Sequence, residues 1–247
     1  MTYAQDERAA LAALLTETGP EAPTLCEGWQ TRDLAAHLVL RERRPDADAG
    51  VMGGPLAGYT ARVQRSYLGR YSFDELIGMF KSGPPRLSVF GIPGADEAAN
   101  TVEYFVHHED VRRAAGGWTE RELSAGLSDA LWKRLKGARM FVRSAPTGVV
   151  LVRAGASGVP PIIAKNSTPS VTVAGTPAEL IMWSMGRGRA AHVTFDGPED
   201  AVAKLTAWRR LSPGGMTLRT PRGTEGLRYQ YRPPRRISRR RELPTSL

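Results

Sequence analysis

The sequence predicts an α+β protein in which a helical bundle precedes a small domain of mixed helices and strands. Three observations support this prediction. Apolar residues recur at helical spacing through most of residues 1–145, short runs rich in β-branched residues follow in residues 146–211, and arginine dominates residues 212–247. We therefore expect a helical bundle, a small α+β domain that begins near residues 143–148, and a basic tail that is disordered.

Amphipathic segments in the first part of the chain are expected to form helices, and their apolar faces need partners, so an antiparallel bundle is the economical arrangement. The expected helices cover residues 5–16, 31–44, 59–70, 74–82, 100–115 and 119–140. Thr31 is expected to cap the second helix. Capping boxes are expected to start the fourth and the sixth helices, at residues 72–75 and 119–122. Residues 45–55, rich in Gly, Ala and Asp, predict a loop.

The pattern changes after Ala145. Short segments predict strands at residues 148–153, 161–164, 170–173 and 192–195. Thr176 and Pro177 are typical of the start of a helix, and Gly186 is typical of its end. A last helix is expected at residues 198–211.

Composition limits the class of protein. The 247 residues are 41% hydrophobic and 24% charged, which is ordinary for a globular chain. Apolar runs stay short of the roughly 18 residues that a membrane helix needs, and the N-terminus lacks the apolar core of a signal peptide, so we expect a cytoplasmic protein. Cys26 is the one cysteine, which excludes an internal disulfide and a multi-cysteine zinc site. We expect it to be a free buried thiol.

The net charge of +9 is unevenly distributed. Residues 212–247 contain nine arginines and two glutamates, whereas the other 211 residues contain 25 basic and 23 acidic side chains. The tail therefore accounts for most of the basic character. A solubilising extension is the simpler interpretation of this tail, and contact with nucleic acid or another anion is the alternative.

Residues 100–115 contain the most informative pattern in the chain. At about 100° per residue, His107 lies about 40° from Glu103, and Asp110 lies about 20° from it on the other side. His108 points roughly 140° away, which argues against it as a member of this set. The shared face of Glu103, His107 and Asp110 is consistent with half of a metal site, and also with an ordinary solvated face.

A second imidazole on another helix would complete such a site. His37 lies at an inward-facing position of the helix expected at residues 31–44, and Asp33 precedes it by four residues. His37, Glu103 and His107 would form a three-ligand set for zinc or a similar divalent ion. Asp33 and Asp110 would then hold the imidazole tautomers. On residue types alone, a single histidine on an apolar helix face, such as His37, is more often a core residue than a metal ligand.

Two runs of sequence resemble those of a known family. Residues 28–38, GWQTRDLAAHL, resemble the GW-x-x-x-DL-x-x-H-L signature of the mycothiol-dependent maleylpyruvate isomerase family, which belongs to the DinB-like superfamily of metal-binding bundles. Residues 103–110, EYFVHHED, resemble its second signature, E-x-x-x-H-x-x-D. Residues 173–187 resemble the family's second domain, and residues 41–47 resemble an actinobacterial branch. The resemblance covers roughly residues 5–211.

This resemblance implies a DinB-like antiparallel four-helix bundle that holds a divalent metal, zinc above all, through His37, Glu103 and His107. It also implies that the thiol mycothiol binds the open metal position and attacks an electrophilic substrate. Members of the superfamily are isomerases, thiol transferases or proteins without known activity. The arginine-rich tail and residues 41–57 depart from the typical member.

Arg187 and Arg189 are candidates to bind a substrate carboxylate, although surface placement is the simpler expectation. Three hypotheses about function remain open at this point. The chain is a metal-dependent, thiol-using enzyme of the isomerase or transferase type, a metal-binding module without turnover, or an anion or nucleic-acid binder that works through its tail. A membrane partner is not expected.

Overall fold

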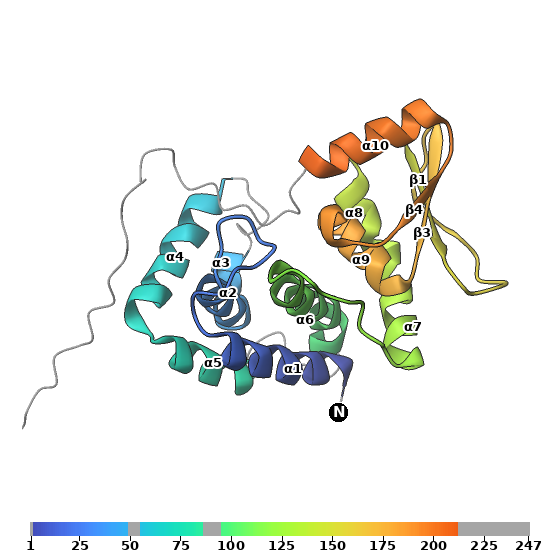
Figure 1. The fold of residues 1–247 in the computed structure, drawn as a ribbon. Coiled ribbons are helices and arrows are strands. Elements are labelled where there is room, and N and C mark those ends of the chain that lie inside the picture. Colours follow the sequence, from blue (N-terminus) through green and yellow to red (C-terminus); the bar gives the residue numbers. More distant parts are fainter. Residues whose placement is uncertain (1, 49–54, 86–94, 212–247) are drawn as a thin grey trace, which may run out of the picture.

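Helices occupy the first part of the chain, and a small sheet with flanking helices occupies the second (Figure 1). The structure is a computed structural model that describes residues 2–48, 55–85 and 95–211. Its four-stranded sheet and surrounding helices confirm the predicted α+β class. Residues 86–94, between the fourth and fifth expected helices, and the basic tail lie outside the described residues.

The N-terminal helices pack around α6 (Ala95–Ala114), which lies between them and the C-terminal elements in Figure 1. Helix α1 packs along α6 and α5, and helix α2 packs against α4 and α5. The bounds of these helices are α1 (Tyr3–Thr18), α2 (Thr31–Arg43), α4 (Ala57–Arg70) and α5 (Phe73–Lys81). A short helix, α3 (Pro45–Asp48), follows the non-helical residue Arg44, in a region where the sequence predicted a loop.

Side-chain caps determine where α2 and α5 begin. The predicted capping box of Ser72 and Glu75 starts α5. At α2 the prediction was wrong, because Gln30 occupies the cap position and forms a capping box with Asp33. Thr31 lies inside the helix, and its hydroxyl donates a hydrogen bond to a carbonyl of the preceding loop.

The helix expected from residues 119–122 begins later. Ser124 caps α7 (Ala125–Arg134) by accepting a hydrogen bond of 3.2 Å from the Leu127 amide. The preceding residues are held in a non-helical path, because Arg121 binds Glu7 and the Thr119 carbonyl accepts from a side chain of α6. After α7 the chain forms a 3₁₀ turn, η2 (Leu135–Ala138), and a short helix, α8 (Arg139–Val142).

The sheet has the strand order β2-β1-β3-β4. Strands β1 and β3 are parallel, and the outer strands β2 and β4 are antiparallel to their neighbours. The strands are β1 (Gly148–Arg153), β2 (Ile162–Lys165), β3 (Ser170–Gly175) and β4 (Thr194–Asp196). Helix α9 (Pro177–Ser184), the 3₁₀ turn η3 (Gly188–Ala190) and α10 (Glu199–Leu211) complete this part. Thr176 caps α9 and Pro177 follows it, as predicted.

Two large hydrophobic clusters form the core. One joins α1, α2 and α5 to α6, and includes Leu11, Leu38 and Tyr104. The other joins Phe105 and Val106 of α6 to α7, α8, the sheet, α9 and α10. Because α6 contributes to both clusters, it connects the bundle to the sheet. The division of the chain near residues 143–148 stays a prediction.

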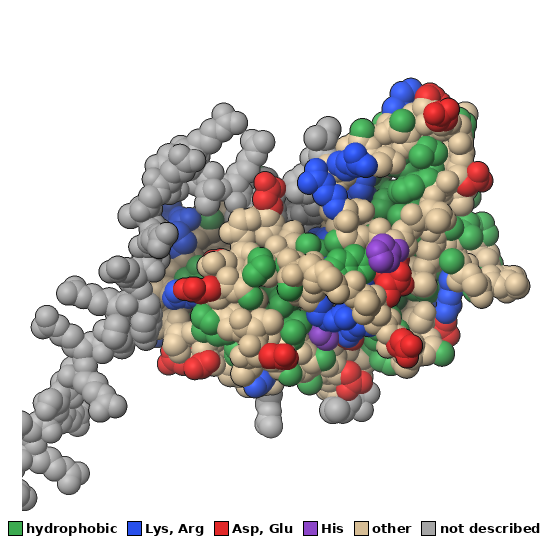
Figure 2. All heavy atoms as spheres, viewed as in Figure 1, with side chains coloured by type: hydrophobic (Ala, Val, Ile, Leu, Met, Phe, Trp, Pro, Cys, Tyr) green, Lys and Arg blue, Asp and Glu red, His purple; other side chains and the backbone are tan. Residues whose placement is uncertain are grey.

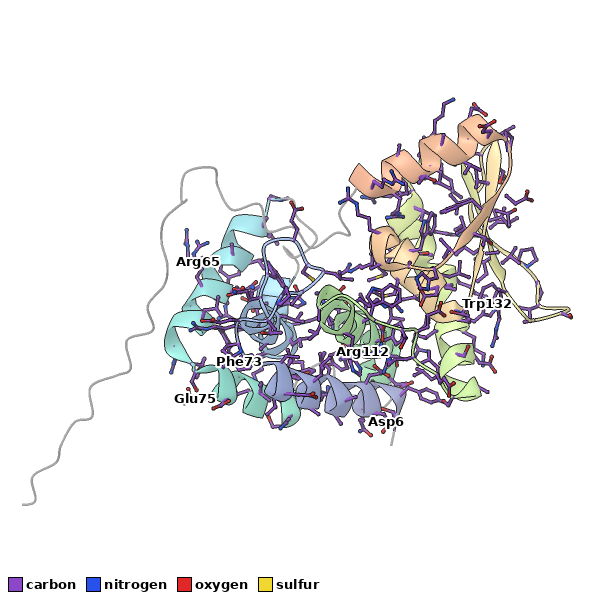
Figure 3. All side chains as sticks on the ribbon, in the orientation of Figure 1. Asp6, Arg65, Phe73, Glu75, Arg112 and Trp132 are labelled. Atoms are coloured by element: carbon purple, nitrogen blue, oxygen red, sulfur yellow. The ribbon has the colours of Figure 1, made fainter. Side chains whose placement is uncertain are left out.

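The outer faces carry the polar side chains. Asp6 on α1 and Glu75 on α5 are exposed and lie on the outside of the molecule in Figure 3. Acidic and basic side chains are interspersed with apolar ones on the face shown in Figure 2. Within the described residues, none of the helices is both long enough and apolar enough to span a membrane.

Candidate metal centre

Helices α2 and α6 bring three potential metal ligands together. The Nε2 atoms of His37 and His107 each lie 3.3 Å from the same atom, Oε1 of Glu103. Both imidazoles are 1% exposed, and the glutamate side chain is 18% exposed. The three donor atoms lie within 4.8 Å of one another, although His37 and Glu103 are 66 residues apart in the sequence.

The loop before α2 helps to position His37. Gly28 has a φ of 75°, in the left-handed region that glycine adopts at little cost, and the chain turns there into Trp29. The indole of Trp29 packs against His37 with a ring-centroid distance of 5.4 Å. The glycine and tryptophan of the first signature therefore shape one wall of the candidate site.

The predicted helical phase of α6 agrees with the geometry. His107 lies beside Glu103 and Asp110, with 2.9 Å between its Nδ1 and Asp110 Oδ2. His108 points to a different face, where its Nδ1 lies 3.1 Å from Glu7 Oε2 on α1. The two neighbouring histidines therefore have separate environments.

Asp110 is held by a side chain from the C-terminal part of the chain. Arg187 donates two hydrogen bonds to Asp110, of 2.8 Å from Nε and 2.7 Å from a terminal nitrogen. Cys26 donates to the same carboxylate at 3.2 Å. Burial and then the charge of Asp110 raise the pKa of Cys26, so the thiol keeps its proton. Asp110, Arg187 and Cys26 thus form a buried, hydrogen-bonded cluster next to Nδ1 of His107.

The surroundings of Glu103 and His107 shift their pKa values in opposite directions. Burial raises the pKa of Glu103, but hydrogen bonds with His107 and His37 and the charge of Arg41 outweigh this and hold the pKa well below its usual value. Burial lowers the pKa of His107, whereas hydrogen bonds with Asp110, Cys26 and Glu103 raise it well above the usual value. Glu103 is therefore an anion, and its partly exposed carboxylate lies between two imidazoles and the Arg41 guanidinium.

The other predicted site residues have different surroundings. Asp33 accepts a hydrogen bond of 3.0 Å from the Gln30 amide, and within the described chain no hydrogen bond joins it to His37. Arg187 is 8% exposed and pairs with Asp110, so it is not at the surface as the simpler expectation had it, and its role in binding a substrate carboxylate stays a prediction. Arg189 is exposed in η3, and its role stays a prediction.

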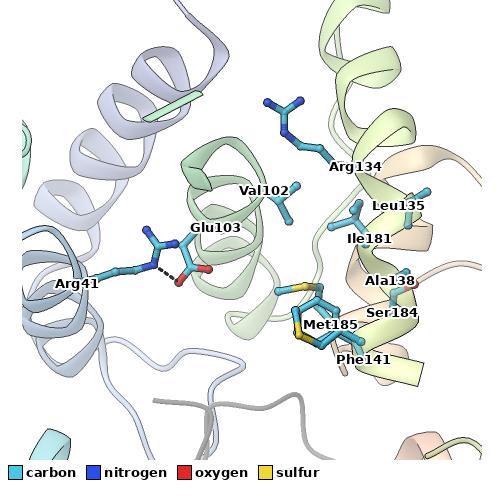
Figure 4. A pocket seen from close by; sticks show the side chains of 12 residues that line it. Arg41, Val102, Glu103, Arg134, Leu135, Ala138, Phe141, Ile181, Ser184 and Met185 are labelled. Carbon is cyan, nitrogen blue, oxygen red and sulfur yellow. Dashed lines mark ion pairs between the residues drawn. The ribbon is translucent and has the colours of Figure 1, made fainter. Parts of the chain in front are cut away.

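Two contributors were missed in the sequence. Arg41 lies one helical turn after His37, and its Nε is 3.5 Å from Glu103 Oε1. A dashed line marks this ion pair in Figure 4. The spacing of four residues was the available signal, because it places both side chains on one face of α2. Cys26 was expected to be buried, but its contact with Asp110 was not predicted. This contact depends on the packing of a loop on α6, where the Leu25 amide donates to the Asp110 carbonyl.

A cavity of about 370 Å³ adjoins the site (Figure 4). Glu103 and Arg41 form one side of it, and residues of α7, η2, α8 and α9 form the other. A cavity of this size is at the lower end of the range for small-molecule sites. The carboxylate of Glu103 is therefore accessible to a small ligand.

A second group of possible ligands is less suitable for a metal. Glu120, Glu179 and His192 have donor atoms within 4.8 Å of one another. The carboxylate of Glu179, however, already accepts hydrogen bonds from both terminal nitrogens of Arg113, at 2.9 and 2.7 Å, and from the His192 amide at 2.7 Å. With its charge balanced by Arg113, this carboxylate is poorly placed to attract a cation.

Comparison with known proteins supports the interpretation of the fold. The model of the mycothiol maleylpyruvate isomerase N-terminal domain matches residues 2–71. The resemblance to this family is confirmed. Two crystal structures of mycothiol-dependent maleylpyruvate isomerase, one of them a histidine-to-alanine mutant, share the fold with TM-scores of 0.53 and 0.51. Each is 16% identical in sequence to this chain, and each match covers 80% of this chain and 92% of the isomerase chain.

No curated protein matches the chain. The match to the isomerase N-terminal domain includes His37 but ends before Glu103 and His107. The similarity to maleylpyruvate isomerase over the rest of the chain is a similarity of fold. The placement of the second signature next to His37 therefore comes from the geometry of α6.

Proposed function

We propose that this chain binds a divalent metal through His37, Glu103 and His107 and uses it to activate a low-molecular-weight thiol. Mycothiol is the thiol named for the structural relatives. The activated thiol would attack an electrophile, in a thiol-dependent isomerisation or thiol transfer. The observation that carries this proposal is the convergence of two imidazole nitrogens on one carboxylate oxygen at equal distances of 3.3 Å.

The donor set fits a metal ion. Two ligands bound at about 2.0–2.1 Å in tetrahedral geometry lie about 3.3–3.4 Å apart. The two nitrogen–oxygen distances of 3.3 Å match this separation and exceed the usual hydrogen-bond length of about 2.9–3.0 Å. Two imidazoles and one carboxylate are a common catalytic zinc set, so zinc is the metal that we propose.

The chain's own residues prepare the site for this chemistry. Nδ1 of His107 donates to Asp110, so Nε2, which faces Glu103, is the nitrogen that would bind the metal once the metal displaces its proton. Arg187 keeps Asp110 ionised and in place. A bound divalent metal would supply the positive charge that favours the thiolate form of a thiol, whose pKa is about 8.5 when free. The adjoining cavity would admit the thiol and its electrophile.

Metal analysis tests the proposal. We expect the purified full chain to contain about one divalent metal per molecule, because three ligands converge on one point. The His37→Ala variant should lose it. Absence of metal from the wild-type chain after incubation with zinc would contradict the proposal.

Assays with mycothiol and a panel of electrophiles then test catalysis. Consumption of the electrophile that needs metal, mycothiol and Glu103 would support an enzyme. Metal binding without any turnover would favour the alternative, a metal- or thiol-responsive binding module.

A further inference from the structure

The cavity beside Glu103 has an apolar interior. Its walls away from α2 are formed largely by Val102, Leu135, Ala138, Phe141, Ile181 and Met185. Figure 4 shows Val102 on α6 facing Ile181 across the space, with Arg134 toward one end and Ser184 toward the other. Met140 also lines the cavity and is 60% exposed, which places it where the cavity meets the solvent. Removal of an apolar group from water into such walls is favourable.

Two hydrogen-bond donors on the cavity wall have no partner among the described residues. They are Oγ of Ser184, a residue that is 1% exposed, and Nε of Arg134. A serine near the end of a helix commonly donates to the carbonyl four residues earlier, and Ser184 does not do so. A buried donor without an acceptor is costly. Each donor therefore favours a ligand that carries an acceptor.

We infer that this cavity binds an electrophile with an apolar, ring-sized body and one acceptor group, a carbonyl or a carboxylate, that Ser184 recognises. The role of this ligand as the target of the thiol rests on the proposed function, whereas its binding does not. The two cationic side chains of the lining already have acidic partners, since Arg41 pairs with Glu103 and Arg134 pairs with Glu97, so the cavity offers little to a second carboxylate. A compact dicarboxylate is therefore expected to bind less well than an aromatic monocarboxylate.

Calorimetric titration of the full chain with trans-cinnamate and with maleate tests this inference. Cinnamate carries a phenyl ring and one carboxylate, and maleate is a small dicarboxylate. We expect cinnamate to bind at least tenfold more tightly than maleate, because its ring enters the apolar part of the cavity.

Two variants locate the binding. Ser184→Ala should weaken cinnamate binding about 3- to 10-fold, the effect of one hydrogen bond. Thr147→Val is the matched control, because Thr147 Oγ1 is also buried without a partner but lies outside the cavity lining. It should leave the affinity unchanged. Val102→Phe should fill the space between α6 and α9 and abolish binding, with thermal unfolding confirming that each variant folds.

The outcomes separate this inference from the proposed function. Equal or tighter binding of maleate, or cinnamate binding that neither Ser184→Ala nor Val102→Phe weakens, would overturn the inference while leaving the metal proposal intact. Cinnamate binding that responds to both variants, in a chain that holds no metal, would support the cavity assignment and contradict the proposed function.

Discussion

His107 and His108 are adjacent in the sequence, but their side chains have different partners. His107 lies 3.3 Å from Glu103, whereas His108 lies 3.1 Å from Glu7. We expect His107→Ala to abolish tight zinc binding, because it removes one of only three ligands, and His108→Ala to preserve it. Competition with a chromogenic chelator measures both affinities. Equal loss in the two variants would show that the phase assigned to α6 is wrong.

Arg187 acts on the site through Asp110, which is fully buried. Arg187→Ala would leave this carboxylate without its strongest partner. Breaking a buried ion pair on one side costs about 3–5 kcal/mol. Loss of a group that orients a ligand lowers metal affinity about 10- to 100-fold. We therefore expect both effects, measured by urea unfolding and by zinc competition.

Arg189→Ala is the control for Arg187→Ala, since Arg189 is exposed and two residues away. We expect it to change neither stability nor zinc affinity. A similar effect in both variants would mean that the contact between Arg187 and Asp110 does not support the site.

Glu7 contributes a stability that depends on pH. Burial raises the pKa of its carboxyl group, but hydrogen bonds from His108 and Arg121 outweigh burial and lower the pKa below its usual value of 4.5. A depressed pKa in the folded state stabilises the protein above pH 4.5, and this stability is lost as the pH falls through the folded-state pKa.

The pH dependence can be measured with Glu7→Gln. We expect this variant to be less stable than the wild-type chain at pH 7, by about 1–3 kcal/mol, because Arg121 loses a charged partner. The difference in free energy of unfolding should shrink as the pH is lowered from 5 toward 3. A difference that stays constant over this range would show that Glu7 has the same pKa in both states.

At the scale of elements, the helices that carry the ligands could be predicted because their signals are local. The helix expected at residues 100–115 agrees with most of α6. The face shared by Glu103 and His107 followed from the helical period alone. The approach of α2 to α6 is not local, and the expectation of it came from the predicted bundle and from the resemblance to a family.

Competition between nearby partners explains what the sequence did not determine. From its position in the sequence, Asp33 could interact with either His37 or the Gln30 amide. Its carboxylate accepts a hydrogen bond from the Gln30 amide, because the amides at the start of α2 lack partners within the helix. The capping box predicted at residues 119–122 does not start α7; Ser124 caps it instead, and a tertiary contact of Arg121 with Glu7 accompanies the later start. The pairing of Arg187 with Asp110 spans 77 residues, beyond any spacing rule.

Helices α6 and α9 are joined by an ion pair that explains how the sheet part attaches to the bundle. Arg113 at the end of α6 binds Glu179 of α9 through two hydrogen bonds, of 2.9 and 2.7 Å, and binds Glu109 at 2.6 Å. Its guanidinium lies 4.2 Å from the centre of the Trp118 ring. The contact between Arg187 and Asp110 is close to this junction in the sequence, because Asp110 precedes Arg113 in α6 and Arg187 follows the end of α9.

Glu179→Gln tests the junction. The variant keeps the shape of the side chain but removes a charge that faces a buried arginine, so we expect a loss of about 3–5 kcal/mol in the free energy of unfolding. Lys204→Gln in α10 is a suitable control, because its ion pair with Asp200 is exposed and should contribute little. If both substitutions cost the same, the junction is not a major source of stability.

At the scale of the whole molecule, α6 belongs to both hydrophobic clusters and also carries Glu103 and His107. The candidate site therefore lies where the two parts of the chain meet. The bundle supplies the three ligands, and the C-terminal part supplies Arg187 and most of the cavity wall. Neither part alone contains both the proposed metal ligands and the proposed substrate cavity.

The distribution of charge over the whole chain leads to a last prediction, about residues 213–247. This segment contains nine arginines and two glutamates, whereas residues 1–212 carry 25 basic and 23 acidic side chains. If the chain binds nucleic acid, the arginines of the tail are its main cations, and each neutralised phosphate contributes about −0.9 to the slope of log affinity against log salt.

We therefore expect deletion of residues 213–247 to remove any salt-dependent binding of double-stranded DNA, measured by fluorescence anisotropy at several salt concentrations. The same deletion should leave zinc affinity and cinnamate binding unchanged, because none of the residues assigned to these sites lies in the deleted segment. DNA binding that survives with its salt slope intact would place the responsible cations in residues 1–212. Because the net charge of that part is close to zero, its basic side chains would then have to be concentrated on one face.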